Sequence, residues 1–143
     1  GNLFYLNRRK CLIFIHSGTR YSVVLTDILK ADVTELPERI IDQMALQFEF
    51  DGIDSGRRLA MQLVHPVSLN SPCPDKVLVG TAVQYVKELE WHAVMEEGGI
   101  YDEEFRRRIP LLNEHPILLR HEGRKVYTDP KQEMRKLAER YSL

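Results

Sequence analysis

Apolar residues concentrate in two dense runs near the start of the chain, and this pattern predicts a β-hairpin. Residues 10–15 are almost all apolar, which is typical of a strand covered by other elements. Residues 21–26 are rich in β-branched and aromatic side chains, which favour a second strand. Between them, Ser17, Gly18 and Thr19 supply the small side chains that a tight turn needs. A short apolar run at residues 4–6 predicts a third strand beside them.

The last third of the chain predicts a second hairpin that is followed by a helix. Two strand-like runs within residues 116–128 flank Glu122-Gly123, a pair that suits a two-residue turn. Asp129 and Pro130 then predict the start of a helix. The aspartate side chain caps the first turn, and proline is favoured at the first helical position.

Two more helices are predicted by apolar residues at helical spacing. Residues 37–48 carry one apolar stripe, and the proline at position 37 suits the first turn. Residues 101–109 begin with acidic side chains and end with arginines, an order that matches the helix dipole. Pro110 is expected to end this second helix.

The middle of the chain predicts irregular strands and one further helix. Residues 59–64 form a short apolar run, and residues 76–86 combine β-branched side chains with a glycine, so both favour strands. A helix is expected from about residue 86, with Trp91 in the core. Because strands and helices do not alternate regularly, the sequence predicts an α+β fold. We expect a single domain with a mainly antiparallel sheet of two hairpins plus irregular strands, packed by about four helices.

The composition is that of an ordinary folded domain. The chain has 143 residues, 43% of them hydrophobic and 29% charged, with a net charge of -1. This balance gives no overall attraction to nucleic acid, and no run approaches the roughly 18 apolar residues of a membrane span. Two cysteines, Cys11 and Cys73, make no disulfide framework and favour an intracellular compartment, the cytoplasm or the nucleus. Because the chain begins at Gly1 without methionine, we expect residues 1–143 to be one domain of a longer protein.

The neutral total hides alternating blocks of charge. Residues 32–54 and residues 87–104 each carry seven acidic residues and one basic residue. Residues 105–143 carry ten basic and five acidic residues. Two interpretations stay open: the basic residues converge on one binding surface, or they pair with the acidic helices of the same chain. The candidate binding residues are Arg106, Arg107, Arg108, Arg120, Arg124, Lys125, Tyr127 and Lys131.

Recognisable catalytic motifs are absent from the sequence. It contains no dinucleotide or phosphate-binding glycine motif, no GxSxG, no HExxH and no CxxC pair. His16 and Ser17 are adjacent on a predicted strand, so their side chains point to opposite faces and do not form a base–nucleophile pair. We therefore expect no catalytic residue, no metal and no cofactor. An enzyme would need Asp51, Asp54, His65 and His115 to converge in one pocket, and we predict that they do not.

These observations favour a non-catalytic interaction or regulatory domain of a larger intracellular protein. Its expected partner is another protein or a neighbouring domain of the same chain. One alternative is a nucleic-acid-binding module that uses the basic C-terminal third. A second alternative is a hydrolase or nuclease with a carboxylate and histidine site. An exposed hairpin edge also leaves homodimerisation open.

Overall fold

A computed structural model describes residues 2–54, 56–64, 75–95, 99–101 and 103–141. Within these ranges the chain is an α+β domain with antiparallel sheets, which confirms the predicted fold class. The strands are β1 (Asn2–Leu6), β2 (Arg9–Ile15), β3 (Ser22–Leu25), β4 (Ile117–His121) and β5 (Arg124–Thr128). The α-helices are α1 (Leu36–Phe50), α2 (Gly56–Val64), α3 (Lys76–Met95), α4 (Glu103–Leu111) and α5 (Pro130–Tyr141). Short 3-10 turns occur at η1 (Lys30–Val33), η2 (Gly99–Tyr101) and η3 (Leu112–Glu114).

The predicted N-terminal strands form one sheet in the order β1-β2-β3. Asn7 and Arg8 both have positive φ angles, 50° and 65°, so they close β1 and β2 with the turn type that suits the twist of paired strands. The central strand β2 buries Cys11 and Ile13 on one face of the sheet. Phe14, on the opposite face, packs against a different cluster. Covering on both faces explains why the run at residues 10–15 is almost entirely apolar.

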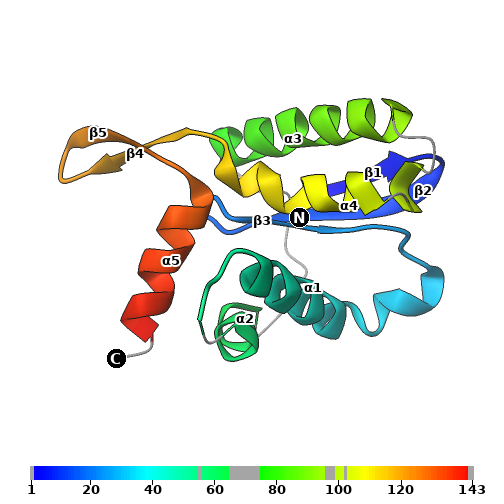
Figure 1. Ribbon diagram of the computed structural model, residues 1–143, viewed down its shortest axis with the longest axis horizontal. Coiled ribbons are helices and arrows are strands. Elements are labelled where there is room, and N and C mark those ends of the chain that lie inside the picture. Colours follow the sequence, from blue (N-terminus) through cyan, green and yellow to red (C-terminus); the bar gives the residue numbers. More distant parts are fainter. Residues whose placement is uncertain (1, 55, 65–74, 96–98, 102, 142–143) are drawn as a thin grey trace.

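Helices cover both faces of this sheet, giving three layers (Figure 1). On one face, α3 and α4 bury Leu89 and Phe105 against Cys11 and Ile13. On the other face, α1, α2 and α5 form a second cluster around Phe48, which contacts the ring of Tyr21 with centroids 5.2 Å apart. The sheet therefore joins two separate hydrophobic clusters.

Two segments predicted as strands are helices. Residues 59–64 belong to α2, which buries Leu59 and Ala60. Residues 76–86 are the first half of α3, whose N–H groups at Val77 and Leu78 donate to the Asp75 carboxylate at 2.9 and 3.3 Å. This cap begins the helix. The buried residues of α3 recur every three or four positions, so one helical stripe packs on the sheet. They are Leu78, Ala82, Tyr85, Leu89 and Ala93.

Other helix predictions are partly corrected. Helix α4 continues through Pro110 to Leu111, because a proline in the last turn of so short a helix disrupts little of the hydrogen-bond ladder. Trp91 is 60% exposed, so its predicted place in the core is wrong; its ring contacts His92 instead. The predicted cap of the last helix is confirmed, since the Gln132 N–H donates to Asp129 at 2.8 Å.

Candidate functional site

The outer edge of β3 is covered by side-chain amides from Ser22 to the Val24 N–H. The Asn113 side chain accepts a hydrogen bond from the Ser22 N–H at 2.6 Å and donates to the Ser22 carbonyl at 3.0 Å. Gln47 donates to the same carbonyl at 2.8 Å and accepts a longer bond from the Val24 N–H at 3.5 Å. Both amides are buried, with exposed fractions of 0% for Asn113 and 1% for Gln47. They replace the neighbouring strand that Ser22 lacks.

A groove of about 770 Å³ lies beside the β3 edge, and Gln47 of the amide clamp forms part of its wall. We call this cavity the β3 groove. Val24 of β3 and Thr26, just after the strand, line its floor, and α1 and α4 line it from the two sides. In Figure 1, β3 runs between these two helices. The α1 side presents Leu46 and Phe50, which are 61% and 56% exposed. The groove thus combines a sheet edge with apolar side chains open to solvent.

The β3 groove also holds charges of both signs. Arg39 pairs with Asp32 at 2.9 Å, and Arg107 pairs with Glu103 at 2.8 Å. Arg106 donates from Nε to the Ile100 carbonyl at 3.4 Å. Among the described residues, no carboxylate lies within ion-pairing distance of Arg106 and no basic group lies that close to Glu49, the groove's other unmatched charge.

Sequence reasoning identified Arg106 and Arg107 but missed the α1 side of the groove. The buried stripe of α1 contains Ile40, Ile41, Met44 and Phe48. Leu46 and Phe50 lie off this stripe and four residues apart, so they share an exposed face. Their position outside the buried stripe of a helix was the sequence signal from which Leu46 and Phe50 could have been predicted.

The second hairpin forms an arm, residues 117–128, that projects from the body of the domain (Figure 1). Its turn is confirmed at Glu122 and Gly123, both with positive φ angles of 52° and 79°. The register places Leu118 opposite Tyr127 and Arg120 opposite Lys125, all on one face of the arm. Tyr127 is 81% exposed.

The structure distributes the predicted binding residues over three places. Arg106 and Arg107 line the β3 groove, and Arg108 lies behind them on α4, half-buried. The arm carries a second group, all of it exposed: Arg120, Arg124, Lys125 and Tyr127. Lys131 stands apart at the base of α5, where its ammonium pairs with Glu114 at 2.9 Å. For Arg107 and Lys131 the competing interpretation, pairing within the chain, is the observed one.

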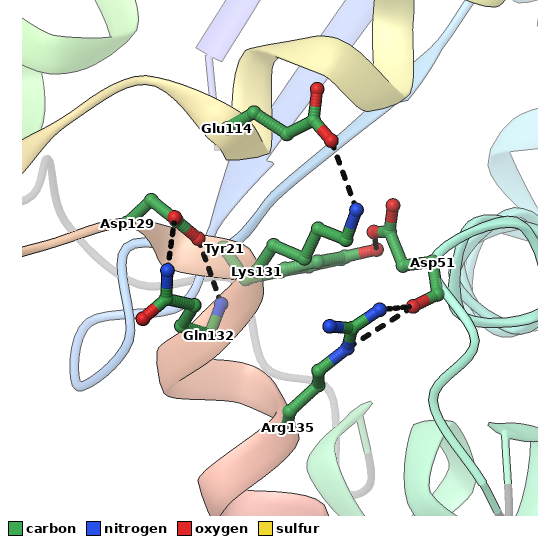
Figure 2. A network of polar contacts seen from close by, with 7 residues as sticks. All are labelled: Tyr21, Asp51, Glu114, Asp129, Lys131, Gln132 and Arg135. Atoms are coloured by element: carbon green, nitrogen blue, oxygen red, sulfur yellow. Dashed lines mark hydrogen bonds and ion pairs between the residues drawn. The ribbon is translucent and has the colours of Figure 1, made fainter.

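Lys131 belongs to a polar network that fixes α5 to the body (Figure 2). The Tyr21 hydroxyl donates to the Asp51 carboxylate at 2.6 Å, and both residues are buried. The Arg135 guanidinium donates to the Asp51 backbone carbonyl, from Nε at 3.2 Å. Burial raises the pKa of Asp51, and the Tyr21 hydroxyl and the Lys131 cation oppose that rise. This network anchors α5, with Tyr21 and Asp51 buried at its centre and Glu114, Gln132 and Arg135 exposed around them.

The four residues of the hypothetical enzyme have different surroundings. Asp51 is engaged with Tyr21, Asp54 is exposed, and His115 pairs with Glu88 of α3 at 2.8 Å. His65, like Cys73, lies outside the described residues. Across the described ranges, no group of three or more His, Cys, Asp and Glu side chains is placed to hold a metal ion. The described helices include none that is long and apolar enough to cross a membrane.

The fold and the groove together define a small α+β domain with a groove beside the β3 edge, between α1 and α4. The chain belongs to the family described as Domain of unknown function (DUF6933), whose model matches residues 1–133. The matched region includes the sheet, both helices of the β3 groove and the arm. No curated protein and no solved structure matches the chain.

Proposed function

We propose that this chain is a non-catalytic interaction domain that binds an extended segment of another protein in the β3 groove. The observation that supports this function is the groove beside the β3 edge, flanked by α1 and α4 and reaching past the amide clamp to Thr26. An extended peptide adds to an edge strand through backbone groups that are not already bonded. The Ser22 N–H, the Ser22 carbonyl and the Val24 N–H are bonded to Asn113 and Gln47, so the added segment pairs at the Val24 carbonyl and the backbone that follows it. The helices on either side restrict which side chains the added strand can carry.

The groove specifies the chemistry of that segment. Alternate side chains of an added strand point to opposite faces of the sheet, so one set faces α1 and the other faces α4. An apolar residue matches Leu46 and Phe50 on α1. A basic residue matches Glu49 on the same helix, and an acidic residue matches Arg106 on α4. We therefore expect an extended segment that carries both an acidic and a basic residue and at least one large apolar side chain.

The proposal is tested by selecting peptides of about ten residues from a random display library on the intact domain. Selected peptides are then measured against Leu46→Ser and Phe50→Ser variants by isothermal titration. Because both side chains are exposed, these substitutions leave folding nearly unchanged, within about 0.5 kcal/mol. We expect each to weaken binding. The matched control is Leu118→Ser on the arm, which is 43% exposed and lies outside the groove.

A charge exchange gives the sharper test. Arg106→Glu replaces an attraction with a repulsion, so peptides carrying an acidic residue should bind roughly three- to thirtyfold more weakly. The same peptide with its charges exchanged should bind the double variant Arg106→Glu/Glu49→Arg as well as the original pair. The proposal would be overturned if the selected peptides bound all the variants, Leu46→Ser, Phe50→Ser, Arg106→Glu and the double variant, with the affinity they have for the wild type.

The arm supports a second candidate function, binding of nucleic acid. Arg120, Arg124 and Lys125 are exposed, and the described residues place no carboxylate within ion-pairing distance of them. Tyr127 is exposed beside them, and an aromatic ring among basic groups is suited to base stacking. Labelled single- and double-stranded oligonucleotides at about 50 and 200 mM salt test this function by fluorescence anisotropy. Binding that collapses at high salt and is lost in Tyr127→Ala and Arg124→Ala supports it.

The oligonucleotide assay also separates the two functions. A variant with Arg106, Arg107 and Arg108 changed to Ala alters the β3 groove and leaves the arm intact. Oligonucleotide binding lost only in this variant would assign nucleic acid to the groove and contradict the peptide proposal. No binding at either salt concentration would exclude the second candidate.

A further inference from the structure

The turn between β2 and β3 holds Arg20 in a strained conformation. The predicted turn is confirmed: the His16 N–H donates to the Tyr21 carbonyl, and the Arg20 N–H donates to the His16 carbonyl, both at 2.8 Å. The His16 ring and the Thr19 hydroxyl form a further hydrogen bond of 3.0 Å. The positive φ angle falls at Arg20, at 65°, and not at Gly18. An arginine with a left-handed backbone is uncommon and is held only by its surroundings.

Arg20 lies in a pocket of about 530 Å³ between α3 and the segment that leads into the arm. Tyr85 forms part of the wall and stacks on the ring of His115, with centroids 5.7 Å apart. The remaining wall has an apolar part and a polar part. The apolar residues are Val77, Pro116, Ile117 and Leu118, and the polar ones are Thr81, Gln84 and Glu88.

One guanidinium nitrogen of Arg20 has no hydrogen-bond partner among the described residues. Its Nη1 atom is buried and has no hydrogen-bond partner in the described part of the chain. Glu88 is the carboxylate of the pocket, but its two oxygens face His92 at 3.8 Å and His115 at 2.8 Å. It lies beyond ion-pairing distance of Arg20. Nη1 itself is enclosed, but Arg20 as a residue is half-buried and is the one arginine or lysine among the described residues that line the pocket. A cationic donor that lines a pocket without a paired carboxylate favours an anionic ligand there.

We infer that this pocket binds a small aliphatic molecule through an anionic oxygen group, a carboxylate or a phosphate. The anionic group accepts hydrogen bonds from the Arg20 guanidinium, whose planar arrangement of donors fits either oxyanion. The aliphatic part lies against Val77, Ile117 and Leu118. The Glu88–His115 pair closes the polar side and disfavours a second anionic group there. The inference is independent of the β3 groove, which shares no residue with this pocket.

The inference is tested by NMR titration of the intact domain with butyrate and with butyl phosphate, which separate the two anionic groups. Butanol, which has the same aliphatic chain and no charge, is the control ligand. We expect at least one anion to shift the Arg20 guanidinium resonances and to give contacts between its methyl group and Ile117 or Leu118. Shifts with butanol as large as with both anions, or no shifts with either anion, would overturn the inference.

Two variants distinguish binding from a structural role of Arg20. Arg20→Gln should weaken the anion roughly ten- to hundredfold, as expected for loss of a charged hydrogen bond. Arg58→Gln, an exposed arginine on α2, should leave the affinity unchanged. Arg20→Gly relieves the positive φ angle, so its Tm should equal or exceed that of the wild type while binding is lost. A lower Tm for Arg20→Gly, together with an unchanged affinity of Arg20→Gln, would make Arg20 purely structural.

Discussion

The amide clamp on β3 makes a quantitative prediction for Asn113→Ala. The substitution removes both hydrogen bonds to Ser22, at 2.6 and 3.0 Å, in a place where Asn113 is 0% exposed. The Ser22 carbonyl keeps its bond from Gln47, but the Ser22 N–H loses its acceptor. A buried, unsatisfied N–H costs about 1–3 kcal/mol, and the lost donor bond with the small cavity adds about 1 kcal/mol. We expect a loss of about 2–4 kcal/mol, a large part of the stability of an ordinary domain.

Urea unfolding followed by circular dichroism measures this loss. With a slope of about 2 kcal/mol per M, typical of a domain of this size, the midpoint should fall by roughly 1–2 M. Gln62→Ala is the matched control, because Gln62 is an exposed amide on α2 and its loss should change stability by less than about 0.5 kcal/mol. If Asn113→Ala and Gln62→Ala have the same midpoint, the clamp does not hold the β3 edge and the reasoning is refuted.

Three further predictions concern titratable groups. Burial lowers the pKa of His16, and its Nδ1 accepts a hydrogen bond from the Thr19 N–H at 3.2 Å. The folded state therefore favours the neutral ring, so stability should fall as pH drops below about 6.5. In urea midpoints measured at several pH values, His16→Gln should flatten this dependence. Burial raises the pKa of Asp51, so its contribution to the free energy of unfolding is fully present below the ordinary carboxyl pKa and is lost as pH rises. The stability of Asp51→Asn relative to wild type should therefore increase between about pH 4 and pH 7. A relative stability that decreases over this range would contradict the assignment. Cys11 is 0% exposed and burial raises its pKa, so in a Cys73→Ala variant iodoacetamide should alkylate it only after unfolding, which mass spectrometry of native and urea-treated samples detects.

Local signals in the sequence were sufficient for the hairpins and for the helices with a clear cap. Asp129 and Pro130 mark the start of α5, and Glu122-Gly123 marks the turn of the arm, because each choice depends on neighbouring residues alone. The prediction of a strand at residues 76–86 failed for a physical reason. Val77 and Val83, which favoured a strand, are 61% and 45% exposed, so they contribute little to the packing that selects the helix. The buried stripe on the opposite face of α3, from Leu78 to Ala93, packs on the sheet and selects the helix.

The candidate sites depended on tertiary contacts that the sequence does not contain. Arg106 was identified from local charge, but Leu46 and Phe50 face it only after α1 and α4 pack on either side of β3. Arg20 and His115 meet in the same way, because both line the pocket beside α3 although they are far apart in the chain. Patterns of spacing identify elements, whereas the surfaces between elements require the packed structure.

The amide clamp also sets an order of events during synthesis. Ser22 and Asn113 are 91 positions apart, so β3 leaves the ribosome long before the acceptor of its N–H exists. At about 5–20 residues per second the nascent strand waits roughly 5–18 s, while a β-hairpin forms in about 1–10 μs. The N-terminal sheet can therefore form early with one edge incomplete. During that interval the Ser22 N–H is open to pairing with other nascent chains even after Gln47 has bonded the Ser22 carbonyl and the Val24 N–H, and only translation past residue 113 supplies its acceptor.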